Sequence, residues 1–102
     1  MDSDEMVKLS VRGVTVEVSL QTLLKVPDSS LEAMFSGRHL LPQKNGKIEI
    51  DRDPVLFRHV IQFLRNDLKC PFLYEYQQKA FEEELEFWGL PHPRNLVLES
   101  LQ

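Results

Sequence analysis

The residues best able to form specific polar contacts are Asp51, Arg52 and Asp53, which stand together just before Pro54. Carboxylates and a guanidinium can pair with opposite charges or accept backbone N–H groups. Asp53 precedes a proline, and aspartate followed by proline is typical of a helix start, where the carboxylate caps the helix. In that interpretation Asp51 and Arg52 are solvated surface charges that contribute little to stability.

Other reactive side chains do not form a recognisable catalytic pattern. The chain has one cysteine, Cys70, and three histidines spread along the sequence, whereas a structural metal site needs about four converging ligands. No nucleophile motif, glycine-rich phosphate loop or paired acid–base motif occurs, so nothing orders a serine, histidine and aspartate into a triad. We therefore predict no catalytic residue, no metal and no cofactor, and a protein that is not an enzyme. Cys70 is expected to be a packed thiol.

Composition places the chain among ordinary globular domains. Its 102 residues are 42% hydrophobic and 27% charged, which suits one domain with one core. The net charge is -4 with scattered cations, so binding to nucleic acid or to an anionic membrane is not expected. A lone cysteine, an acidic start and the lack of a long apolar run predict a cytoplasmic protein without membrane insertion.

The first expected element is a β-hairpin. Apolar and polar residues alternate over 7–11 and again over 14–18, with Arg12-Gly13 between the two runs. A two-residue turn there pairs Val11 with Val14 and places all the apolar side chains on one face. The turn type stays open, because Arg-Gly is not among the favoured turn pairs. A short strand over 47–50 can extend this hairpin, and residues 38–46 are expected to form a loop.

Helices are expected at four places. Ser19 and Ser29 are suited to cap two short helices, the second ending at Gly37. A longer helix starts after Asp53 and runs to about residue 66, with an apolar arc broad enough for two packing neighbours. The last helix spans roughly 74–88, with Glu82, Glu83 and Glu84 on a solvated face. Together these elements predict an α+β domain in which short and long helices pack on a small sheet.

Three motifs in series resemble the BTB/POZ potassium-channel-tetramerisation family of the channel-tetramerisation-domain type. They are the segment from Leu23 to Gly37, the segment Ile50 to Asn66 that contains Asp51-Arg52-Asp53, and the closing Glu86-Phe87-Trp88-Gly89-Leu90. The resemblance implies a BTB/POZ fold over residues 7–90, an acidic extension at 1–6 and a tail at 91–102. It departs from the family at Arg12-Gly13, where a longer glycine motif is common, and at Trp88, where tyrosine is usual.

The resemblance implies homo-oligomerisation in a ring of four or five copies. The interface is then expected to contain charged residues of both signs: Asp51, Arg52, Asp53, Arg58, Arg65 and Arg38. The loop residues His39, Leu40 and Leu41 are expected to contact a partner; alternatively, this segment only closes the preceding helix. With a single cysteine, the zinc site of many related channels cannot form, which favours the zinc-free branch of the family. The expected function is a scaffold or substrate adaptor for a cullin-type ubiquitin ligase; the alternative is a cytoplasmic assembly domain of a potassium channel.

Overall fold

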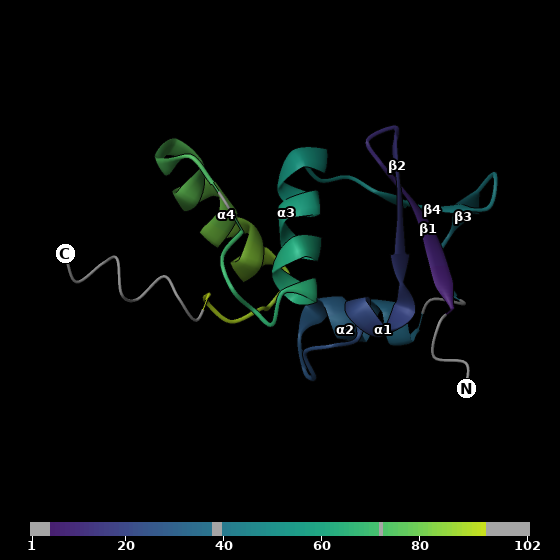
Figure 1. The fold of residues 1–102 in the computed structure, drawn as a ribbon. Helices are drawn as coiled ribbons and strands as arrows, with labels where there is room; N and C mark the ends of the chain where they lie inside the picture. The colour runs from purple at the N-terminus through teal and green to yellow at the C-terminus, as the bar shows by residue number, and fades with distance from the viewer. Residues whose placement is uncertain (1–4, 38–39, 72, 94–102) are drawn as a thin grey trace.

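A computed structural model describes residues 5–37, 40–71 and 73–93. Figure 1 shows the sheet at one end, α3 beside it and α4 at the other end, with α1 and α2 running below the sheet and α3. The elements in chain order are β1 (Met6–Val11), β2 (Val14–Ser19), α1 (Leu20–Leu23), α2 (Ser30–Ser36), β3 (Gln43–Lys44), β4 (Lys47–Ile50), α3 (Pro54–Arg65) and α4 (Glu75–Phe87). This mixture of a small sheet with helices confirms the predicted α+β class.

The predicted hairpin is confirmed in its register. Val11 pairs with Val14, Leu9 with Val16 and Val7 with Val18. Arg12 and Gly13 both have positive φ, of 49° and 87°, which defines the mirror-image type I′ turn whose twist suits a hairpin. The sequence leaves the turn type open, and the structure shows type I′. A positive φ is unfavourable for a residue with a side chain, so Arg12 adopts this conformation at some energetic cost.

The sheet contains one strand more than the sequence predicts. Its strand order is β2-β1-β4-β3, with β4 parallel to β1 and β3 antiparallel to β4. The prediction of an unbroken loop over 38–46 is wrong at Gln43–Lys44, which form β3. Both side chains are exposed, so no apolar alternation marks the strand; the signal is instead the Asn45-Gly46 turn, with φ of 56° and 77°.

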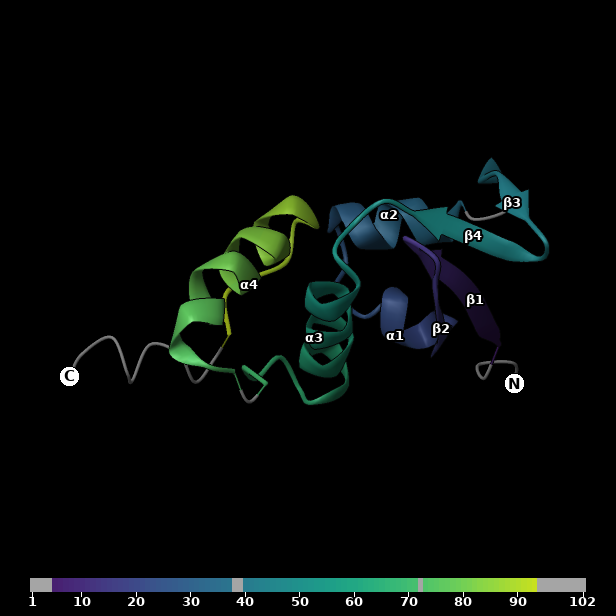
Figure 2. The same ribbon diagram turned by 90° about the horizontal axis from the view of Figure 1, so that it is seen from above.

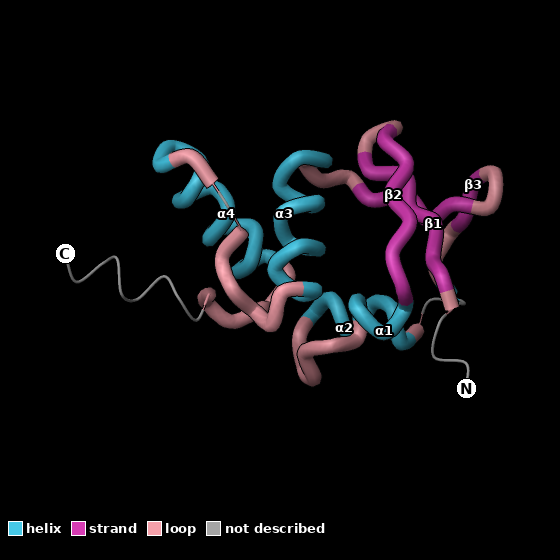
Figure 3. The backbone as a smooth tube through the Cα atoms, viewed as in Figure 1, coloured by secondary structure: helices cyan, strands magenta, loops and turns pink. Residues whose placement is uncertain are grey.

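Polar caps set the helix starts as predicted. The Ser19 hydroxyl accepts the Thr22 N–H, and the Ser29 hydroxyl accepts the Glu32 N–H. At the end of α4, the Leu90 N–H donates to the Leu85 carbonyl, and Gly89 takes a φ of 71°. This is the Schellman arrangement that a glycine favours. In Figure 3 a long loop follows α3 and leads back to the start of α4.

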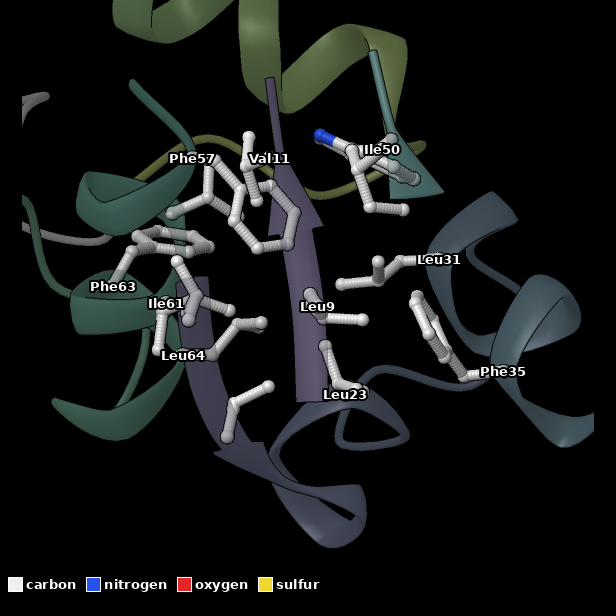
Figure 4. Close-up of a cluster of buried hydrophobic side chains, with 14 of the residues drawn as sticks. Leu9, Val11, Leu23, Leu31, Phe35, Ile50, Phe57, Ile61, Phe63 and Leu64 are labelled. Carbon is white, nitrogen blue, oxygen red and sulfur yellow. The ribbon is translucent and has the colours of Figure 1, made fainter. Parts of the chain in front are cut away.

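Helix α3 is buried on two sides, as its broad apolar arc predicts. Phe63 packs edge-on against Phe81 of α4, with the ring centroids 5.9 Å apart, while α1 and β2 contact α3 from the other side. Figure 2, seen from above, also shows α3 between α4 and the sheet. Buried apolar side chains from the helices and the strands form one hydrophobic core. Figure 4 labels ten of them: Leu9, Val11, Leu23, Leu31, Phe35, Ile50, Phe57, Ile61, Phe63 and Leu64.

Candidate interaction surface

The junction between β4 and α3 carries the three charged residues that the sequence singles out. Asp53 caps α3, because its Oδ1 accepts the N–H groups of Val55 at 2.8 Å and Leu56 at 3.1 Å. Asp51 accepts a hydrogen bond from Arg12 Nε at 2.8 Å, and its side chain is 93% exposed. An ion pair this exposed contributes little to stability. The capping expected of Asp53 is therefore present.

Arg52 binds within its own subunit. Its Nη2 donates to Glu84 Oε1 at 2.8 Å and its Nε donates to Glu84 Oε2 at 3.1 Å, a two-pronged contact. The guanidinium carbon also lies 3.7 Å from the centroid of the Phe87 ring. The hydrogen bond with Glu84 raises the pKa of Arg52; burial opposes this rise, and the charges of Glu84 and Asp51 support it. Arg52 thus holds the β4–α3 junction against α4.

The expectation that Glu84 lies on a solvated helix face is wrong. Its side chain is only 3% exposed, and its Oε2 also accepts the Trp88 Nε1–H at 3.0 Å. Glu84 follows Phe81 by three positions and precedes Trp88 by four, so helical spacing places it on the buried face. That spacing is the signal by which the sequence could have revealed Glu84. Glu83 is exposed, as expected, and Glu82 is partly exposed.

Arg58 and Arg65 lie on the exposed side of α3. Neither forms an ion pair with another residue in the described part of the chain. They border a shallow hollow of about 320 Å³ between α3 and β2, whose other walls include Thr15 and Glu17. Within the described subunit no ion pair joins them to Asp51 or Asp53, so any such pairing has to come from another copy.

The predicted partner-binding loop is described only in part. Arg38 and His39 lie outside the described residues. Leu40 is 89% exposed, which is unusual for so large an apolar side chain, whereas Leu41 is partly buried against the core. Of the two described leucines in this loop, Leu40 is thus the one whose side chain is free to contact a partner.

Two other side chains with reactive atoms, Cys70 and His59, lie against buried residues. Cys70 is partly buried and packs against the core, as expected of a packed thiol. His59 lies edge-on to Phe81, and its Nδ1 is buried with no hydrogen-bond partner in the described subunit. Across the described ranges no three histidine, cysteine, aspartate or glutamate side chains are grouped as a metal site would require.

The fold is thus a small mixed sheet with a helical cover, and it exposes charged side chains and the apolar Leu40. The sequence profile of the BTB/POZ domain matches residues 7–97. The chain belongs to the BTB/POZ domain family, in its channel-tetramerisation branch. Within the described residues, no helix has the length and apolar character needed to cross a membrane.

Several relatives contain this domain as part of a longer chain. The BTB/POZ domain-containing protein KCTD3 of Homo sapiens is 39% identical over 101 residues, which is 94% of this chain and 12% of the relative. KCTD18 of Bos taurus is 32% identical over 93 residues, covering 90% and 22%. The FH protein interacting protein FIP2 of Arabidopsis thaliana is 45% identical over 88 residues, covering 83% and 29%. The chain therefore spans less than a third of each of these relatives.

Proposed function

We propose that this chain assembles with copies of itself into a ring of four or five subunits and serves as a scaffold or substrate adaptor for a cullin-type ubiquitin ligase in the cytoplasm. The observation that carries the proposal is the match of nearly the whole chain to the BTB/POZ domain. A ring presents several weak sites at once, and their linkage raises the overall avidity for a partner.

The proposed interface contains Asp51, Arg52, Asp53, Arg58, Arg65 and Arg38. Exposure supports this assignment for Asp51, Arg58 and Arg65, whose charged groups reach solvent in the single subunit. Arg52 is only partly exposed and is held by Glu84, so its contribution is to fix the junction that carries Asp51 and Asp53. A head-to-tail contact between two different surfaces closes into a ring when the rotation permits.

We expect the purified chain to have a mass in solution of four or five times the subunit mass of 11.9 kDa. The proposed contacts are between charges near the surface, so salt should weaken them. Raising the salt from about 0.1 M to about 1 M shortens the screening length from roughly 10 Å to 3 Å, and the average mass in solution should fall as the assembly dissociates. Light scattering at both salt concentrations measures this. A single-subunit mass in a concentrated sample at low salt would contradict the proposal.

The loop His39-Leu40-Leu41 is the proposed cullin contact. Leu40 is 89% exposed in the single subunit, so a cullin that binds this loop would cover it. We expect Leu40→Asp to abolish capture of a purified cullin while leaving self-assembly intact, because the contact would then bury an unpaired carboxylate. Met6→Asp is a matched control, since Met6 is also an exposed apolar residue but lies at the start of β1. Equal cullin capture by both variants would argue against this loop. In the alternative function, assembly of potassium-channel subunits, the ring forms and the cullin does not bind.

A further inference from the structure

The outer side of α3 carries a polar stripe with two arginines that form no ion pair with any described residue. Arg58, Gln62 and Arg65 are all exposed and stand at positions i, i+4 and i+7, which line up along one side of a helix. Hollows flank the stripe on both sides, one toward β2 and one bordered by His59, Gln62, Arg65 and Pro71. By contrast, Arg12 and Arg52 each pair with a carboxylate of their own subunit. The stripe is therefore open to a partner that supplies negative charge.

The outer side of α4 has the opposite charge at the same spacing. Glu75, Lys79 and Glu82 also stand at i, i+4 and i+7, beside the face that buries Phe81 and Leu85; Glu75 and Lys79 are exposed and Glu82 is partly exposed. Glu83 adds a further carboxylate to this side. None of these side chains forms an ion pair with another described residue. Each stripe thus has like charges at its ends, about 10 Å apart along the helix.

We propose that the α4 stripe of one copy docks on the α3 stripe of the next copy, with the two helices parallel. In this register Glu75 faces Arg58, Glu82 faces Arg65, and Lys79 donates to the amide oxygen of Gln62. The inference rests on the proposed self-assembly and names the surfaces that carry it. Opposite charges at matched spacing favour this register and disfavour others, because a shift brings like charges together.

The positions of the two helices suit a head-to-tail contact. In Figures 1 and 2 α4 stands at one end of the subunit, while α3 lies between α4 and the sheet. The two outer sides thus belong to different parts of the subunit surface, so a copy that offers its α4 to one neighbour can receive the α4 of another on its α3. Contacts of this heterologous kind close into a ring when the rotation between neighbouring copies permits.

The carboxylates at the strand-to-helix junction are less suited to face Arg58 and Arg65. Asp53 accepts two backbone N–H groups at the start of α3, and Asp51 pairs with Arg12. Each of these contacts uses Oδ1, so only the Oδ2 atoms of Asp51 and Asp53 remain without a partner among these contacts. Glu75 and Glu82 form no ion pair with a described residue, so both oxygens of each carboxylate can accept from an arginine, as a two-pronged contact requires. We therefore assign the contact with Arg58 and Arg65 to α4.

Charge reversal on either stripe tests the inference. We expect Arg58→Glu with Arg65→Glu to raise the dissociation constant of the assembly at least about tenfold, because like charges then face each other across the contact. Glu75→Lys with Glu82→Lys should weaken it similarly. Lys8→Glu with Lys44→Glu makes the same change in net charge as the arginine pair, but on the sheet, and should leave the assembly intact. Circular dichroism shows whether each variant remains folded.

Mixing the two charge-reversed variants provides the decisive measurement. Each variant alone has two stripes of like charge, but the α4 of either one matches the α3 of the other. Differently tagged variants should therefore capture each other and fail to capture themselves, and an alternating ring closes only with an even number of copies. Weakened variants that do not capture each other would overturn the pairing, as would variants that assemble like the wild type. A wild type that remains a single subunit would instead contradict self-assembly itself.

Discussion

Replacing Arg52 by alanine is expected to lower the free energy of unfolding by about 2–3 kcal/mol, since it leaves a buried carboxylate without its cation. Glu84 is 3% exposed and would retain only the Trp88 N–H as a partner. The contact of the Arg52 guanidinium with the Phe87 ring is lost as well. Urea unfolding at a fixed subunit concentration measures the change, and fixing the concentration matters because assembly itself stabilises the folded chain.

Arg12→Ala is the matched control for this experiment, because it also removes an arginine from an ion pair but lies outside the proposed interface. The Arg12–Asp51 pair has the same N–O distance as the Arg52–Glu84 pair, 2.8 Å, but its side chains are 57% and 93% exposed. Its loss should cost less than about 1 kcal/mol. Replacing Arg52 by methionine and Glu84 by leucine together should recover most of the stability, because no buried charge then remains. Equal losses for Arg52→Ala and Arg12→Ala would show that burial does not decide the strength of these pairs.

The fold follows from local signals to a large extent. Alternation over 7–18 fixes the register of the hairpin, because only a two-residue turn keeps Val11 opposite Val14 with every apolar side chain on one face. Serine and aspartate caps fix where three helices start. These signals act between residues close together in sequence. They are therefore readable from the sequence without knowing how the elements pack.

The contacts that the sequence does not reveal are the long-range ones. Arg52 and Glu84 are 32 positions apart, and their pairing depends on how α4 lies against the β4–α3 junction. Each looks like a surface charge when taken alone, which is why the sequence predicts a solvated face for the acidic run in α4. The parallel pairing of β4 with β1 is a similar case, because the sequence predicts a strand there but not its direction. Composition and spacing suggest which residues form polar contacts. How the helices pack decides whether the partner of such a residue lies in the same subunit or in another molecule.

The close approach of α4 to α2 leads to the second large expected effect. Gly89→Ala should lower the free energy of unfolding by about 3 kcal/mol. A Cβ at this position would lie 2.9 Å from the Ser30 backbone nitrogen and 3.2 Å from its hydroxyl oxygen. The φ of 71° adds the cost of a left-handed conformation for a residue with a side chain. Relief of the clash would pull apart the hydrogen bond from the Leu31 N–H to the Trp88 carbonyl, which joins the two helices.

Gly46→Ala separates the two causes of this loss. Gly46 has a similar φ of 77°, but a Cβ there would have no heavy atom within 4 Å apart from those of Gly46 itself and its two neighbours in the chain. It therefore carries only the conformational cost, about 1–2 kcal/mol. Urea unfolding gives the free energy of unfolding of each variant. The difference between the two losses measures how closely the end of α4 is held against the start of α2. If Gly89→Ala costs no more than Gly46→Ala, the two helix ends separate easily, and α4 is then free to shift relative to the rest of the subunit.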